Sequence, residues 1–176
     1  MCKKIDNKVK IALMFIPIAY FSFFFHELGH WIIGEVLGND MILRLNGVSP
    51  KSGQYLENTH LYVLLGGICF TLLLSLTSWF VIEKYKIIYL YPVVFYNFFM
   101  RLCPQIIKFD WQDEAKISML LGIGKYTVAI IVLVGLLLIT WRTSYVLKRN
   151  YKDNLLYVIV SLICTFLVIF TDDIFF

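Results

Sequence analysis

Charged residues are scarce in this sequence. They make up 16% of the 176 residues, whereas 60% are hydrophobic and 17% are aromatic, and the mean hydropathy is +0.76. A water-soluble protein of this length could not bury so much apolar surface. The composition therefore excludes a soluble protein and predicts an integral, multi-pass membrane protein that contacts the lipid bilayer.

Paired cysteines and strong basic clusters are also missing. The four cysteines are scattered without C-x-x-C spacing, which predicts no disulfide framework. The net charge is only +4, and the basic residues lie between apolar segments. This pattern suits anionic lipid and control of topology, and it excludes nucleic acid as a partner. Because no repeat, low-complexity tract or separate soluble domain is evident, we expect a single domain over residues 1–176.

Five apolar segments follow one another, and we expect an all-α fold with about five transmembrane helices. The third segment is short and contains Pro92, which predicts a kink or partial insertion. The first segment begins like a signal peptide but lacks a small-x-small cleavage site, so we expect it to be retained. The segments cover about 11–38, 60–82, 87–101, 115–141 and 155–171.

A polar insertion follows the first segment. Alternating side chains in "MILRLNGV", followed by Pro50 and Gly53, favour a short β-hairpin at the membrane surface, with an ordinary loop as the alternative.

With five spans and the N-terminus inside, ten basic residues fall on inner segments and five on outer ones. The positive-inside rule thus predicts an inner N-terminus and an outer C-terminus.

The first segment contains "HELGH", an H-E-x-x-H motif made by His26, Glu27 and His30. On a helix, positions i and i+4 lie about 40° apart in projection and about 6 Å apart along the axis. Both imidazoles can therefore bind one Zn²⁺, while Glu27 can take a proton from a water beside it. Hydrogen bonding between helices is the alternative role, but ionisable residues inside a membrane point to function.

A catalytic zinc needs a third protein ligand, and the motif supplies only two. His60, Asp110 and Asp113 are the candidates. A histidine at a helix entrance is typical of the interface. The two aspartates follow the third segment and return to the membrane depth of "HELGH", so either of them could bind the metal.

Glycines support a tightly packed site. Gly66 and Gly67 lie in the second segment, and glycine lets neighbouring helices approach closely. Simple helix packing is the alternative explanation for each of them.

An H-E-x-x-H motif in an apolar helix, a glycine-containing second helix and a later aspartate after an Asn/Pro stretch resemble the site-2 protease family of intramembrane zinc metalloproteases. The resemblance implies His26 and His30 as zinc ligands and Glu27 as the general base. It favours Asp113 as the third ligand, because "DEAKI" is similar to the family's Asp-containing start of the next helix, with Asp110 as the alternate.

The same resemblance implies that Asn97, Gly66 and Gly67 contact the substrate. The match departs from the family pattern in three places: no glycine follows either aspartate, no proline follows Gly66, and Asn97 is well separated from Pro104. Family members hold zinc nearer the cytoplasmic face, whereas the charge distribution predicts the outer side.

The function implied is a zinc-dependent endopeptidase that cleaves a membrane protein in or near a transmembrane helix, in the plasma membrane of a prokaryote. The alternative is a non-proteolytic zinc-binding membrane protein that binds a client helix. The intact Glu27 argues against that alternative, because metal binding alone needs no base. An accidental motif would bind no stoichiometric zinc.

Overall fold

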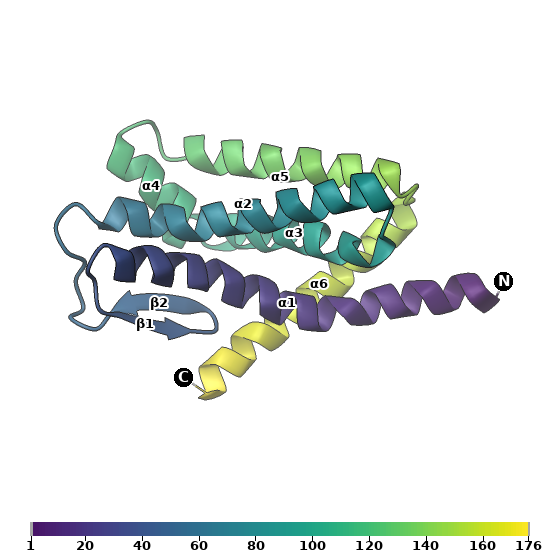
Figure 1. Ribbon diagram of the computed structural model, residues 1–176, viewed down its shortest axis with the longest axis horizontal. Coiled ribbons are helices and arrows are strands. Elements are labelled where there is room, and N and C mark those ends of the chain that lie inside the picture. The colour runs from purple at the N-terminus through teal and green to yellow at the C-terminus, as the bar shows by residue number, and fades with distance from the viewer. Residues whose placement is uncertain (1, 176) are drawn as a thin grey trace.

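The structure is a computed structural model that describes the backbone of residues 2–175 and the side chains of residues 9–175. Across this range six α-helices form a bundle, one two-stranded antiparallel sheet lies at its edge beside α1, and two single 3₁₀ turns join helices (Figure 1). The elements are α1 (Cys2–Val36), β1 (Met41–Arg44), β2 (Gly47–Pro50), α2 (His60–Tyr85), η1 (Ile88–Leu90), α3 (Tyr91–Ile107), η2 (Phe109–Trp111), α4 (Asp113–Leu121), α5 (Thr127–Val146) and α6 (Tyr151–Phe175).

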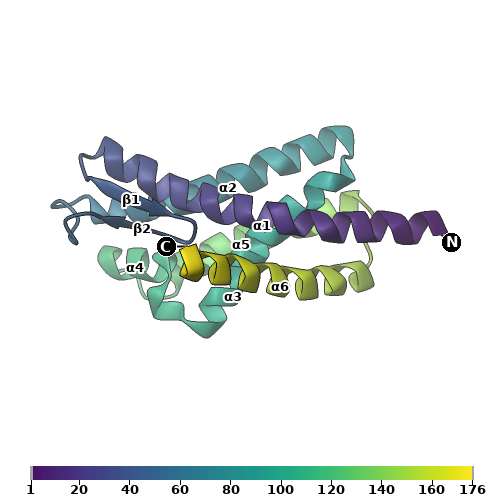
Figure 2. The same ribbon diagram turned by 90° about the horizontal axis from the view of Figure 1, so that it is seen from below.

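The chain runs back and forth along one axis (Figures 1 and 2). Helix α1 leads to the end of the bundle that holds the hairpin, α2 returns, and α3 leads back to α4 at the hairpin end. Helices α5 and α6 then add one more pass in each direction. The N-terminus, at the start of α1, lies at the end of the bundle opposite the hairpin. Helices α1 (from Val9), α2, α5 and α6 are each long and apolar enough to span a bilayer, which makes this a multi-pass membrane protein.

The predicted all-α fold with a hairpin after the first helix is confirmed, with three differences in the helices. The sequence predicts about five membrane spans, whereas four helices of the described residues are long and apolar enough to cross a bilayer, because α3 has only 17 residues. The expected segment 115–141 is two helices, because Gly122 and Gly124 adopt φ values of 65° and 91° between α4 and α5. This left-handed conformation ends a helix and suits glycine. Of the two expectations for Pro92, the kink is wrong, because Pro92 lies in the first turn of α3, where no helical hydrogen bond is lost. Partial insertion of this segment stays a prediction.

The hairpin is anchored to the two helices beside it. Strands β1 and β2 pair from Met41 opposite Pro50 to Arg44 opposite Gly47. Glu35 at the end of α1 accepts a hydrogen bond from the Met41 amide at 2.8 Å. Asp172 near the end of α6 accepts one from the amide of Asn46 at 3.2 Å. These contacts fix the hairpin beside the second half of α1.

Helices α1 and α2 cross in direct backbone contact. A Cβ atom built on Gly29 would lie 2.5 Å from the carbonyl oxygen of Gly66, which is too close for any side chain. Only glycine at both positions permits this approach. The crossing brings the inner face of α1, with its two histidines, directly against α2.

Candidate metal centre

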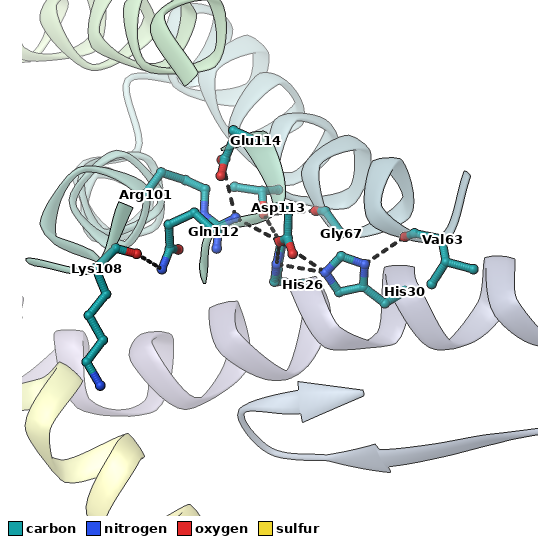
Figure 3. A network of polar contacts seen from close by, with 10 residues as sticks. His26, His30, Val63, Gly67, Arg101, Lys108, Gln112, Asp113 and Glu114 are labelled. Atoms are coloured by element: carbon teal, nitrogen blue, oxygen red, sulfur yellow. Dashed lines mark hydrogen bonds and ion pairs between the residues drawn. The ribbon is translucent and has the colours of Figure 1, made fainter. Parts of the chain in front are cut away.

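Two histidines of α1 and the first residue of α4 meet in the bundle (Figure 3). The Nε2 atoms of His26 and His30 lie 3.1 Å apart. The Oδ2 atom of Asp113 lies 3.1 Å from Nε2 of His26 and 3.3 Å from Nε2 of His30. Both histidines are buried, and the Asp113 side chain is 17% exposed. The three residues form a buried His-His-Asp cluster that could hold a metal ion.

The far side of each imidazole is held by α2. Nδ1 of His30 lies 2.7 Å from the carbonyl oxygen of Val63, and a carbonyl can only accept, so Nδ1 carries the proton. Nδ1 of His26 lies 3.0 Å from Oγ1 of Thr71. That hydroxyl donates its proton to the carbonyl of Gly67 at 3.1 Å, so it accepts from His26. Each neutral imidazole therefore directs the lone pair of Nε2 toward Asp113.

This donor set fits a metal ion. Three lone pairs that face one another repel unless a positive charge lies between them, and one proton could bridge only one of the three pairs. Around a tetrahedral zinc with bonds of about 2.0 Å, neighbouring ligand atoms are about 3.3 Å apart. The observed separations of 3.1, 3.1 and 3.3 Å are close to that value. We conclude that His26, His30 and Asp113 are suited to binding one ion.

Gly66 and Gly67 lie at the crossing of α1 and α2, under the cluster. Gly66 packs against the backbone of Gly29. A Cβ atom on Gly67 would collide with Nε2 of His30 and lie 2.5 Å from Cε1 of His26. The two glycines thus make room for the helices and the imidazoles, and their predicted contact with a substrate stays a prediction.

Glu27 follows His26 on α1 and lies close enough to His30, Asp113 and Arg101 to interact with them electrostatically. It is 9% exposed. Within the part of the chain that the structure describes, its carboxylate makes no hydrogen bond and no ion pair of its own. Glu27 is therefore near the cluster, and its carboxylate is unpaired among the described residues.

Arg101 and Glu114 extend the cluster, and neither is among the site residues that the sequence predicts. Nη1 of Arg101, on α3, lies 3.3 Å from Oδ2 of Asp113 and 3.3 Å from Oε1 of Glu114. Both side chains are buried. Burial raises the pKa of Glu114, and the guanidinium opposes that rise. The presence of an arginine in the apolar third segment could have indicated a site residue, since charged residues in such segments usually have a function.

The other predicted site residues lie outside the cluster. Asp110, in η2, is exposed and pairs with Lys125. His60 stacks on Tyr55 with ring centroids 4.4 Å apart. The structure thus brings Asp113, and neither Asp110 nor His60, to the two motif histidines.

Asn97 is fully buried on α3. Its Nδ2 atom donates to Oγ of Ser75 at 3.0 Å, and its Oδ1 atom has no partner among the described residues. One half of this amide therefore has a structural role, while its predicted contact with a substrate stays a prediction.

Comparisons with protein-family models, curated proteins and solved structures found no match to this chain. The resemblance to site-2 proteases therefore rests on the motifs in the sequence. The chain itself is a multi-pass helical membrane protein with a buried His-His-Asp cluster.

Proposed function

We propose that this protein is a zinc-dependent intramembrane endopeptidase that hydrolyses a peptide bond in or near a transmembrane helix of a membrane-protein substrate. One observation carries the proposal: Oδ2 of Asp113 lies 3.1 and 3.3 Å from the Nε2 atoms of His26 and His30 in an H-E-x-x-H motif. Two histidines and a carboxylate, with one position left for water, are a donor set typical of catalytic zinc.

The charges around the cluster favour a divalent cation. When ionised, the carboxylates of Glu27, Asp113 and Glu114 together with the guanidinium of Arg101 carry a net charge of −2. Uncompensated charge is costly in the low dielectric of a membrane protein interior. An ion of charge +2 would neutralise this group.

The proposed reaction is a hydrolysis in which Glu27 transfers a proton from water to the leaving group. The chemistry that Zn²⁺ supplies, when bound, is a lower pKa for water and polarisation of the scissile carbonyl. Glu27 accepts a proton from the attacking water and passes it to the nitrogen of the leaving amine. Among the described residues its carboxylate has no hydrogen bond or ion pair that would compete with these transfers. The substrate helix must unwind locally, because helical hydrogen bonds occupy its carbonyl groups.

The test compares wild type with Glu27→Gln, which keeps the shape of the side chain but removes the base. Membranes that contain each protein would be analysed for new peptide termini by mass spectrometry, and the zinc content of each purified protein would be measured. We expect equal zinc in both, and new termini in transmembrane segments with the wild type alone. Glu35→Gln is the matched control on the same helix, because Glu35 binds the Met41 amide and lies outside the cluster.

If Glu27→Gln produced the same termini as wild type, the proteolytic mechanism would be wrong. If the wild type bound zinc but produced no new termini, the non-proteolytic alternative would be favoured, in which the protein binds a client helix without cleaving it.

A further inference from the structure

We propose that Arg101 is a positioning residue for the metal: its guanidinium holds the Asp113 carboxylate toward the two histidines, and Glu114 holds Arg101. The inference rests on the proposed zinc site. Figure 3 shows Arg101 reaching from α3 to the start of α4, where dashed lines join its guanidinium to the carboxylates of Asp113 and Glu114. A single nitrogen, Nη1, contacts both of them at 3.3 Å.

The arrangement explains why a full positive charge is buried at this place. The Arg101 side chain is 7% exposed and that of Glu114 is fully buried. Removing one partner of a buried ion pair leaves the other charge uncompensated, which is strongly destabilising. Glu114 therefore keeps the guanidinium next to α4, beside the neighbouring residue Asp113.

Arg101 contacts the same atom that faces the histidines. Oδ2 of Asp113 lies 3.3 Å from Arg101 Nη1 and 3.1 Å from Nε2 of His26. An aspartate side chain can rotate about two bonds, and Asp113 retains some exposure through which its carboxylate could turn away. A fixed charge on α3 opposes that rotation. Partners of this kind, which orient a ligand without binding the metal, typically change metal affinity by about 10–100-fold when they are removed.

The sign of the effect separates positioning from simple electrostatics. A guanidinium repels a nearby cation, so an Arg101 that acted only through its charge would weaken zinc binding, and its removal would tighten it. A positioning Arg101 has the opposite effect: its removal releases the Asp113 carboxylate and weakens binding.

The experiment measures zinc affinity by competition with a chromophoric chelator, using the full-length purified protein in detergent. We expect Arg101→Met to bind zinc about 10–100-fold more weakly than wild type. Arg101→Lys should recover much of this loss, because one nitrogen makes both contacts. Glu114→Gln should also weaken binding, since a neutral amide oxygen holds the guanidinium less strongly than a carboxylate does.

Arg149→Met is the matched control. Arg149 is another poorly exposed arginine with a carboxylate partner, Asp153 at 3.6 Å. It belongs to the loop between α5 and α6, and this loop lies at the end of the bundle opposite the hairpin. Its loss removes an ion pair of similar burial without touching the cluster. Zinc affinity in this variant should equal that of wild type.

A folded Arg101→Met protein with unchanged or tighter zinc binding would overturn the inference while leaving the zinc site intact. If Arg101→Met did not fold, Glu114→Gln would decide: wild-type zinc affinity in that variant would overturn the inference as well. Absence of zinc from the wild type would instead refute the proposed site on which the inference rests.

Discussion

Gly67 lies directly against the imidazole of His30, with no space for a methyl group between them. The Thr71 hydroxyl and the Val63 carbonyl hold the Nδ1 atoms of His26 and His30 from the same helix. Helix α2 therefore sets the position of both imidazoles, although it supplies none of the three candidate ligands.

The contact between Gly67 and His30 predicts that a single methyl group added at position 67 would weaken zinc binding. Gly67→Ala should push His30 out of position, and overpacking of this kind costs about 1–3 kcal/mol. We expect a clear loss of zinc affinity in the chelator competition assay. Gly135→Ala is the control, because nothing lies within 4 Å of the position that its Cβ would occupy. Equal zinc affinity in the two variants would contradict this role of Gly67.

We expect Thr71 to affect zinc affinity because it orients the imidazole of His26. Thr71→Val keeps the shape of the side chain but removes the acceptor of the Nδ1 proton, which lies 3.0 Å away. We expect zinc affinity to fall by about tenfold or more. Thr77→Val, on an exposed part of the same helix, removes only local bonds to the Leu73 and Leu74 carbonyls and should leave affinity unchanged. Identical behaviour of the two valine variants would mean that Thr71 does not orient His26.

Removal of Asp113 and removal of Asp110 should have very different effects on zinc content. Asp113→Ala should lose zinc and activity, because its Oδ2 atom is one of the three converging donors. Asp110→Ala should keep most of its zinc, since Asp110 pairs with Lys125 away from the cluster. Metal analysis of both purified proteins checks this expectation. Loss of zinc from Asp110→Ala alone would show that the loop is in the wrong register.

The orientation in the membrane can be read from two loops. Lys51 follows the hairpin and Lys148 joins α5 to α6, and these loops lie at opposite ends of the bundle (Figure 1). Single cysteines at these positions, in a cysteine-free background, should react oppositely with a membrane-impermeant thiol reagent. The distribution of basic residues predicts that Lys51 is outside. The reverse pattern would place the metal on the cytoplasmic side, as in site-2 proteases.

The parts of the site that depend on local spacing could be predicted from the sequence. His26 and His30 are one helical turn apart, so their shared face follows from helix geometry alone. The third ligand could be narrowed to two nearby aspartates, Asp110 and Asp113. That choice depends on where α4 begins, and α4 begins at Asp113 itself.

The parts that depend on helix crossing could not be predicted in this way. Arg101 and Glu114 meet because α3 and α4 are oriented by the rest of the bundle, and no spacing in the sequence encodes that contact. The break between α4 and α5 did have a signal, in Gly122 and Gly124. An apolar segment of spanning length concealed it, because hydropathy is insensitive to backbone conformation.

The most direct measurement is the metal content of the purified protein. Wild type prepared from zinc-containing medium should hold one zinc ion per chain by elemental analysis, because three donors converge at one point. A variant with both His26→Ala and His30→Ala should hold none, while Arg149→Met should match the wild type. Wild-type protein without stoichiometric metal, or a double variant with the same metal content, would contradict a zinc site in this cluster.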